Sequence, residues 1–317
     1  MRRSRDPHQL LDAARSGDRG ALARLLSIVE QGGAPAGEIG RLAYREGGAA
    51  YTVGVTGSPG AGKSTLTSAL IGCIREADSA VAVLAVDPSS PFSGGAILGD
   101  RVRMQDHALD PGVFIRSMAT RGHLGGLALA TPEAIRVLDA AGTEIVIVET
   151  VGVGQVEVEI AGSADTTMVV VNPGWGDAVQ ANKAGLLEIA DLFVINKADR
   201  AGVAETRRDL EQMLDMSDLT GWRPPVVDAV ATTGEGVAEV WDAVGRHRAH
   251  MEQDGRLQRR RADRLVREVR DIVVARVEEQ ASAALRGDAL ERLRDALVER
   301  RTDPYTAADE IVAGLSL

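Results

Sequence analysis

The chain has 317 residues, a formal net charge of −10 and 44% hydrophobic residues, which suits a core domain of ~200 residues with additional segments. Basic and acidic residues are interleaved along the chain, and this argues against a nucleic-acid partner. The chain has one cysteine, and it has neither an apolar run of ~18 residues nor an apolar segment at the N-terminus. These features predict a cytoplasmic protein without disulfides or membrane spans.

The first 49 residues predict a small helical extension. Apolar residues recur at helical spacing over residues 8–30, with a break at Gly17, and again over residues 37–46.

Residues 50–250 show a different pattern, in which short β-branched runs alternate with turns and helical stretches. The predicted strands are Thr52–Val55, Val81–Val86, Val113–Ile115, Ile145–Val148, Met168–Val171, Leu192–Ile195 and Val226–Val230. This alternation predicts an α/β domain with a mostly parallel sheet that is covered by helices on both faces.

Residues 251–317 lack strand patterns and predict a helical tail. A long amphipathic helix is expected over residues 256–285, and Gly287 and Pro304 divide the remainder into two shorter helices. The apolar positions on one face of the long helix are Leu265, Val269, Ile272, Val273 and Val277. This stripe suits packing onto the sheet domain and a dimer contact about equally.

Residues 57–64 (GSPGAGKS) match the P-loop pattern and lie between a predicted strand and a predicted helix, as a P-loop should. Its glycines let backbone N–H groups surround a phosphate at the positive end of the helix. Lys63 should bridge the β- and γ-phosphates, and Ser64 should ligate Mg²⁺. The predicted nucleotide-binding residues here are Gly57, Ser58, Pro59, Gly60, Ala61, Gly62, Lys63, Ser64 and Thr65.

A guanine-reading pattern, Asn196-Lys197-Ala198-Asp199, directly follows the predicted strand Leu192–Ile195. The Asp199 carboxylate can accept protons from N1 and the 2-amino group of guanine, whereas adenine offers neither. A mismatched base would leave the carboxylate unpaired, so the sequence predicts GTP and GDP rather than ATP as ligands.

Acidic residues lie at the carboxyl ends of two further predicted strands. Asp87 follows Val81–Val86 and Glu149 follows Ile145–Val148, so both should project beside the P-loop, where Mg²⁺ would take one or two carboxylates. Helix-cap or turn roles are the alternative for both acids. Asp100 is a weaker candidate for the same metal site.

The segment Glu149-Thr150-Val151-Gly152 resembles the Asp-x-x-Gly motif that senses the γ-phosphate in GTPases. Val153 follows Gly152 at the position where Ras-like GTPases have a glutamine that orients the attacking water. The sequence therefore predicts slow intrinsic hydrolysis that another molecule stimulates. Gln155 lies nearby, but nothing in the sequence shows that it reaches the water.

Lysine is rare in this chain, with only Lys63, Lys183 and Lys197 among 36 basic residues. Two of the three belong to nucleotide-binding motifs, so we also expect a functional role for Lys183 rather than that of a solvated helix lysine. A glycine-containing segment over residues 172–177, with Trp175, precedes it.

Together these motifs resemble the MeaB/ArgK family of P-loop GTPases, whose best-known members are chaperones of adenosylcobalamin-dependent methylmalonyl-CoA mutase. The similar stretches are residues 54–65, 83–100, 115–128, 147–159, 172–191 and 196–199.

The resemblance implies roles for individual residues. Asp87, Asp100 and Glu149 match the family's metal-site acids, and Lys183 matches a lysine linked to partner-stimulated hydrolysis. Three switch regions of the family correspond to residues 88–100, the region from Glu149 onward and residues 177–183. The resemblance also implies a homodimer through the C-terminal helices. At the second guanine loop Val230-Ala231 replaces the common Ser-Ala, and the Ala231 amide is expected to contact the base.

The expected function is therefore that of a GTPase chaperone, which binds methylmalonyl-CoA mutase or a related acyl-CoA mutase and uses GTP and Mg²⁺ during cofactor loading, protection or reactivation. One alternative is a kinase or ATPase linked to basic amino-acid transport, the activity attached to the ArgK name. Another is a metal-insertion GTPase of the HypB or UreG kind, which one cysteine and five histidines make a poor fit.

Overall fold

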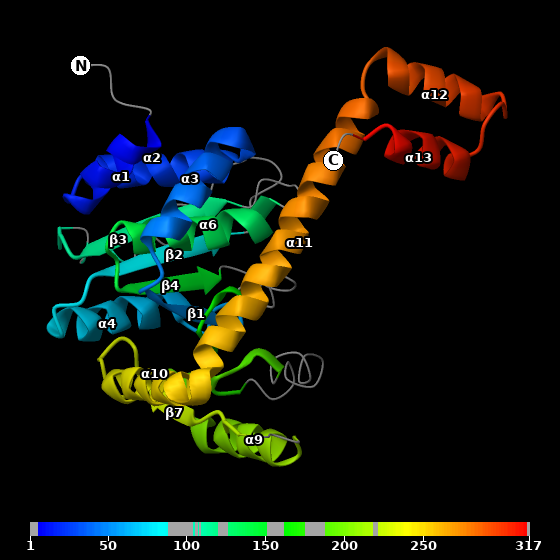
Figure 1. Cartoon of the computed structure of the whole chain (residues 1–317). Helices are drawn as coiled ribbons and strands as arrows, with labels where there is room; N and C mark the ends of the chain where they lie inside the picture. Colours follow the sequence, from blue (N-terminus) through cyan, green and yellow to red (C-terminus); the bar gives the residue numbers. More distant parts are fainter. Residues whose placement is uncertain are drawn as a thin grey trace. The chain divides into compact units, whose positions relative to one another are not determined.

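The computed structural model describes residues 6–87, 104, 107, 109–119, 126–150, 162–174, 188–217 and 221–315. The chain forms two compact units, Met1–Ala262 and Asp263–Leu317, and the elements of each are labelled in Figure 1. No helix within the described ranges is long and apolar enough to cross a membrane.

In the described part of the first unit, seven strands form one sheet with the order β3-β2-β4-β1-β5-β6-β7, and the pairings between them are parallel. Its strands are β1 (Tyr51–Gly57), β2 (Val81–Asp87), β3 (Val113–Ala119), β4 (Ile145–Thr150), β5 (Thr166–Val171), β6 (Leu192–Asn196) and β7 (Val226–Ala229). All seven predicted strands and the parallel sheet are confirmed.

Helices cover both faces of this sheet, which explains why its strands are continuous apolar runs. The helices of this unit are α1 (Pro7–Arg15), α2 (Arg19–Gln31), α3 (Gly33–Glu46), α4 (Lys63–Glu76), α6 (Gly126–Ala140), α9 (Val203–Asp215) and α10 (Val237–Glu252). One face of the sheet packs against α4 and α10. On the other face, α6 covers β2 and β4, and α9 covers β5 and β6.

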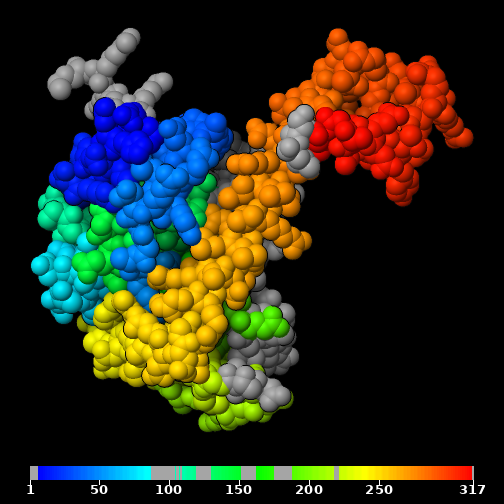
Figure 2. All heavy atoms as spheres, viewed as in Figure 1, coloured from blue at the N-terminus to red at the C-terminus, as the bar shows by residue number. Residues whose placement is uncertain are grey.

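The N-terminal extension is helical, as predicted, and packs onto α6. Leu25 and Leu26 of α2 are fully buried in the core that this extension shares with α6, β2 and β4. Burying an aliphatic side chain of this size contributes about 1.5–3 kcal/mol. In Figure 2 the blue atoms of α1–α3 lie directly against the α/β layers.

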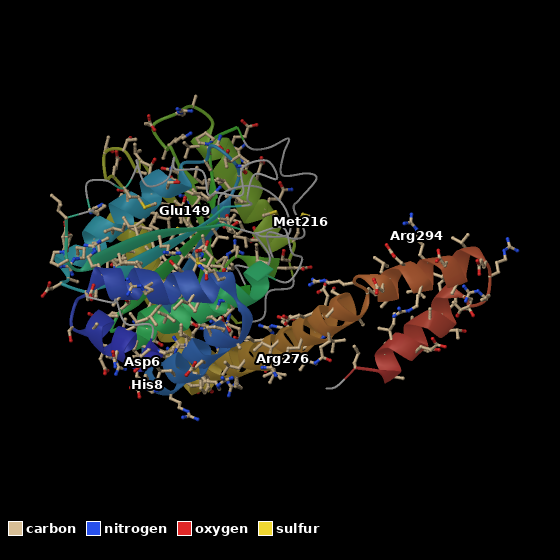
Figure 3. The ribbon with its side chains drawn as sticks, turned by 90° about the horizontal axis from the view of Figure 1, so that it is seen from above. Asp6, His8, Glu149, Met216, Arg276 and Arg294 are labelled. Atoms are coloured by element: carbon tan, nitrogen blue, oxygen red, sulfur yellow. The ribbon has the colours of Figure 1, made fainter. Side chains whose placement is uncertain are left out.

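The second unit consists of helices and continues from α11, which begins in the first unit. Its elements are α11 (Arg256–Ala284), α12 (Asp288–Val298) and α13 (Pro304–Ala313), so the predicted helical tail and its divisions are confirmed. Arg276 and Arg294 project from α11 and α12 into solvent (Figure 3). Several large apolar side chains of α11 are also exposed, namely Val266, Val269, Val273 and Val274.

Candidate functional site

The P-loop connects the carboxyl end of β1 to the amino end of α4. Gly57 ends β1 with φ = +130°, and a Cβ there would overlap the carbonyl oxygen of Val170 on β5. Gly62 caps α4 in the left-handed region, with φ = +91°. Both positions therefore require glycine, and they set the loop directly before the positive end of α4.

Lys63 lies in this loop with its ammonium folded back over it. Its Nζ donates hydrogen bonds to the carbonyl oxygens of Gly57, at 2.6 Å, and Ser58, at 3.2 Å. The residue is only 7% exposed. The positive charge is thus held beside the backbone N–H groups that would receive a phosphate.

Ser64 and Glu149 bring the P-loop and the end of β4 together. The Ser64 hydroxyl donates a 2.5 Å hydrogen bond to Oε1 of Glu149, and both residues are buried. Figure 3 shows Glu149 inside the α/β unit. Hydroxyl and carboxylate oxygens are the ligands that Mg²⁺ prefers, so the pair fits the predicted metal site.

The described residues contain no group of three or more His, Cys, Asp or Glu side chains that could hold a metal. A cage made of protein ligands alone is therefore not found in these parts of the chain. A site of one hydroxyl and one or two carboxylates corresponds to the way Mg²⁺ binds at a triphosphate, where phosphates and waters complete the coordination.

Asn196 links three loops of the predicted nucleotide site. Its Nδ2 donates to the carbonyl oxygen of Ala61, at 2.8 Å, and its Oδ1 accepts the Ala231 amide, at 3.1 Å. The side chain is 2% exposed. The guanine pattern, the P-loop and the second guanine loop are therefore held together by one amide group.

Lys197 adds a second contact between the guanine pattern and the P-loop. Its Nζ donates a 2.5 Å hydrogen bond to the carbonyl oxygen of Gly60, while its backbone adopts φ = +60°. A left-handed backbone at a non-glycine residue costs of order 1–3 kcal/mol and persists only where the surroundings fix it. Asp199, two residues further on, is exposed to solvent.

The structure thus brings together the P-loop, Glu149, Asn196, Lys197, Asp199 and Ala231 at the carboxyl edge of the sheet. Asp87 is the last residue of β2, at the same edge, but its side chain lies outside the described residues. Asp100, Gly152 and Lys183 also lie outside them.

One contact at this edge was not anticipated. Thr206, buried in the first turn of α9, accepts a 3.3 Å hydrogen bond from the Gly174 amide. The contact ties the loop after β5 to the helix that follows the guanine pattern. No local sequence signal marks it, because the two residues are 32 positions apart.

Comparison with known proteins identifies the family. The model of the methylmalonyl-CoA mutase-associated GTPase MeaB matches residues 22–286. The chain belongs to the MeaB family. The resemblance of the motifs to MeaB and ArgK is thereby confirmed, and with it the assignment of the chain as a GTPase.

Relatives of this MeaB-family chain carry related names. A putative GTPase of Pyrococcus abyssi is 51% identical and covers 96% of this chain and 95% of its own length. GTPase ArgK of Escherichia coli is 39% identical, over 80% and 79% of the two chains. The mouse protein named methylmalonic aciduria type A homolog, mitochondrial, is 38% identical over 67% of this chain and 52% of its own length.

A solved structure supports the fold across both units. The crystal structure described as LAO/AO transport system kinase matches with a TM-score of 0.73 and 28% identity, over 98% of each chain. Family membership and the P-loop together indicate that this chain binds guanine nucleotides.

Proposed function

We propose that this MeaB-family GTPase binds an adenosylcobalamin-dependent acyl-CoA mutase, methylmalonyl-CoA mutase or a related enzyme, and couples GTP hydrolysis to cofactor loading, protection or reactivation. The observation that carries the proposal is the match to the mutase-associated family model over residues 22–286. The similarity to the mouse methylmalonic aciduria type A homolog supports it.

The chemistry in this proposal is attack of water on the γ-phosphate of GTP, giving GDP and phosphate. Lys63 and the P-loop amides stabilise the charge that develops on the transferring phosphoryl group. Ser64 and Glu149, with Asp87 and Asp100, would hold Mg²⁺, which would neutralise negative charge on the phosphates when bound. The bond between Ser64 and Glu149 holds two of these side-chain oxygens 2.5 Å apart.

Guanine selection is assigned to the loops after β6 and β7. Asp199 would accept the N1 and 2-amino protons of the base, and Asn196 fixes the loop that carries it against the P-loop. The Ala231 amide already donates to Asn196, so any contact of this amide with the base would have to be shared with that bond.

Partner stimulation is the second part of the proposal. Intrinsic hydrolysis is expected to be slow, because Val153 replaces a water-orienting glutamine. Gly152 is expected to respond to the nucleotide, and Lys183 to the mutase.

We also propose a homodimer through the C-terminal helices, a cytoplasmic location, and a division into residues 1–49, 50–250 and 251–317. The exposed valines of α11 support a protein contact on that helix.

The decisive experiment measures phosphate release from GTP by the purified protein, alone and with methylmalonyl-CoA mutase from the same organism, at saturating Mg²⁺. The proposal expects a slow basal rate that the mutase raises many-fold. A rate indifferent to the mutase would leave the GTPase assignment standing and remove the proposed partner.

A second candidate function is a kinase linked to basic amino-acid transport. The description of the similar solved structure as LAO/AO transport system kinase favours it. The two reactions differ in where the γ-phosphate goes. With γ-labelled GTP, a kinase would transfer the label to a protein or small-molecule acceptor, whereas the GTPase reaction releases it as free phosphate. The phosphate assay therefore separates the two candidates.

A further inference from the structure

The amino edge of the sheet, opposite the nucleotide site, contains the same arrangement twice. Asp165 directly precedes β5; its amide donates to the Thr52 carbonyl of β1 at 2.8 Å, and its carboxylate accepts the Thr52 amide at 3.0 Å. Asp191 directly precedes β6 and makes the same two bonds to Thr167 of β5, at 2.8 Å and 2.7 Å. Each aspartate therefore closes one strand pairing at its amino end.

Each of these aspartates also receives a bidentate arginine from the first turns of α11. Arg261 donates from Nε and Nη2 to the two carboxylate oxygens of Asp165, at 3.1 Å and 2.6 Å. Arg260 donates to both oxygens of Asp191, at 3.1 Å and 3.2 Å. We call these two arginine–aspartate pairs the arginine clip.

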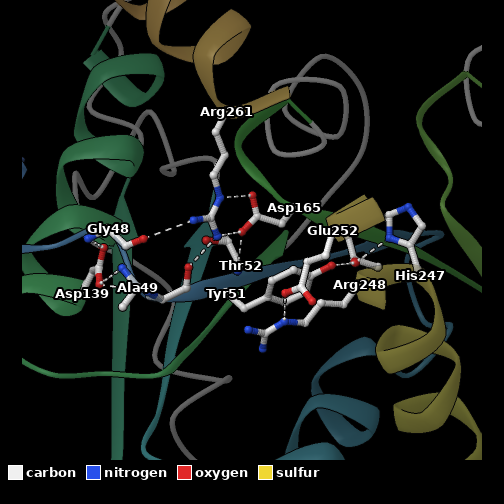
Figure 4. A network of polar contacts seen from close by, with 12 residues as sticks. Gly48, Ala49, Tyr51, Thr52, Asp139, Asp165, His247, Arg248, Glu252 and Arg261 are labelled. Atoms are coloured by element: carbon white, nitrogen blue, oxygen red, sulfur yellow. Dashed lines mark hydrogen bonds and ion pairs between the residues drawn. The ribbon is translucent and has the colours of Figure 1, made fainter. Parts of the chain in front are cut away.

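Arg261 fastens a third segment, the connection between the N-terminal helices and β1. It donates to the carbonyl oxygens of Gly48, at 3.3 Å, and Ala50, at 2.8 Å (Figure 4). The amides of the same connection are bound by Asp139 of α6. The planar guanidinium can reach all of these acceptors at once, which an ammonium group cannot.

The side chains of the arginine clip are more buried than those of a surface ion pair. The Asp165 side chain is 1% exposed and Asp191 15%, while Arg260 and Arg261 are 28% and 30% exposed. Leu257, one turn earlier on α11, is buried in the core beside α4 and α10. The start of α11 is therefore an integral part of the GTPase unit.

Two of the three strands joined by the clip, β1 and β6, lead at their opposite ends into motifs of the nucleotide site. β1 leads into the P-loop, β5 into the loop of Pro173 and Gly174, and β6 into the guanine pattern. We propose that the arginine clip links guanine-nucleotide binding at the carboxyl edge of the sheet to the stability of the first turns of α11. The proposal requires only that the protein binds guanine nucleotides; it does not depend on a mutase partner.

The test is hydrogen exchange of the full-length protein, measured by mass spectrometry with and without GDP and Mg²⁺. If the first turns of α11 open only together with the GTPase unit, bound nucleotide must slow hydrogen exchange in α11 and in β1 by the same factor. At a GDP concentration of 100 times Kd this factor is about 100. In Arg261→Gln, β1 should keep this slowing, while α11 should exchange at nearly the same rate with and without nucleotide. Arg261→Lys should behave like Arg261→Gln.

Arg259→Gln is the matched control, because Arg259 lies on the same helix, carries the same charge and is exposed. It should leave the nucleotide effect on β1 and α11 as in the unmodified protein. Arg260→Gln removes the pair with Asp191 but keeps the contacts of Arg261 with Asp165, Gly48 and Ala50, so it serves as a milder variant should Arg261→Gln fold poorly. Its α11 should retain part of the effect. The proposal is wrong if nucleotide does not slow exchange of α11 in the unmodified protein, or if breaking the clip leaves that slowing unchanged.

Discussion

The Ser64 hydroxyl donates a 2.5 Å hydrogen bond to the Glu149 carboxylate, although the two residues are 85 positions apart in the chain. The bond joins the first turn of α4 to the end of β4 and brings the two side-chain oxygens of the proposed metal site together. Metal binding at this point should therefore depend on both side chains.

Replacing Ser64 by alanine should weaken GDP binding in the presence of Mg²⁺ by about tenfold or more, about 1.4 kcal/mol, because the variant lacks one of the proposed oxygen ligands of the metal. In EDTA the same variant should bind GDP almost as the unmodified protein does. Fluorescent GDP titrations in both conditions measure this difference. Ser68→Ala, on the same helix, is the control, and an equal loss in EDTA would contradict the assignment of Ser64 to the metal.

Asp199→Asn should shift the nucleotide preference from GTP towards xanthosine triphosphate, because the amide donates a proton where the carboxylate accepted one. The change in the ratio of the two affinities should exceed about 100-fold, as expected when a buried polar group of the ligand loses its partner. Competition binding with both nucleotides gives the ratio. Asp209→Asn on α9 should leave it unchanged, and unaltered selectivity in Asp199→Asn would mean that another residue reads the base.

Asn196→Ala should destabilise the protein as well as weaken nucleotide binding. The substitution leaves the Ala61 carbonyl and the Ala231 amide without their buried partner, which costs about 1–3 kcal/mol for each group. Thermal unfolding in the absence of nucleotide measures the structural part. Asn172→Ala provides the comparison, because within the described residues the Asn172 side chain bonds to the adjacent Pro173 carbonyl alone. A similar melting temperature for both variants would disprove the structural role of Asn196.

Stability should fall as the pH decreases through the range in which histidine titrates. Burial lowers the pKa of His247 from its ordinary value of 6.5, and this effect exceeds the opposing attraction of Asp191. The unfolded chain therefore binds this proton at a higher pH than the folded protein does. Below pH 6.5 the free energy of unfolding must decrease, by at most about 1.4 kcal/mol per pH unit from this residue, until the pH reaches the lowered pKa of the folded state.

Urea unfolding between pH 5 and 8 measures this dependence. His247→Gln should remove the part of the slope that His247 contributes, whereas His8→Gln, at an exposed position of α1, should preserve that part. An unchanged slope in His247→Gln would assign the pH dependence to other groups.

Lys183→Ala should abolish stimulation by the mutase and leave the basal rate and GDP affinity nearly unchanged. The expectation follows from the scarcity of lysine in the chain and from the family resemblance. Phosphate release with and without mutase is the measurement, and Lys183→Arg distinguishes a need for charge from a need for lysine itself. Loss of GTP binding in Lys183→Ala would instead place this residue in the nucleotide site.

The strands could be predicted because most are buried on both faces and read as apolar runs, and five of the seven predicted starts match the structure. The start of β5 could not be predicted. β5 begins at Thr166, two residues before the predicted start, and this polar residue is fully buried. Its hydroxyl lies 2.6 Å from the Tyr51 hydroxyl and 2.7 Å from Nδ1 of His247. A polar side chain that finds its partners inside the core interrupts the apolar pattern without ending the strand.

The nucleotide motifs could also be predicted, because each is a contiguous pattern with a local mechanism. The contacts between motifs could not, since Asn196 and Ala61 are 135 residues apart. The arginine clip left no signal either, because Arg260 and Arg261 stand in a helix with many other arginines. Only the folded chain distinguishes them from their solvated neighbours.

The double attachment of Asn196 also limits how the specificity of this protein can be redesigned. Asp199 is exposed, and among the described residues its side chain makes no hydrogen bond or ion pair with the P-loop, so it can be exchanged to accept another base. Asn196 donates hydrogen bonds to two carbonyl oxygens of the P-loop. Exchanging the whole motif would remove these bonds and destabilise the P-loop together with the proposed base pocket. A variant directed at an unnatural nucleotide should therefore start from single changes at Asp199 and keep Asn196 fixed.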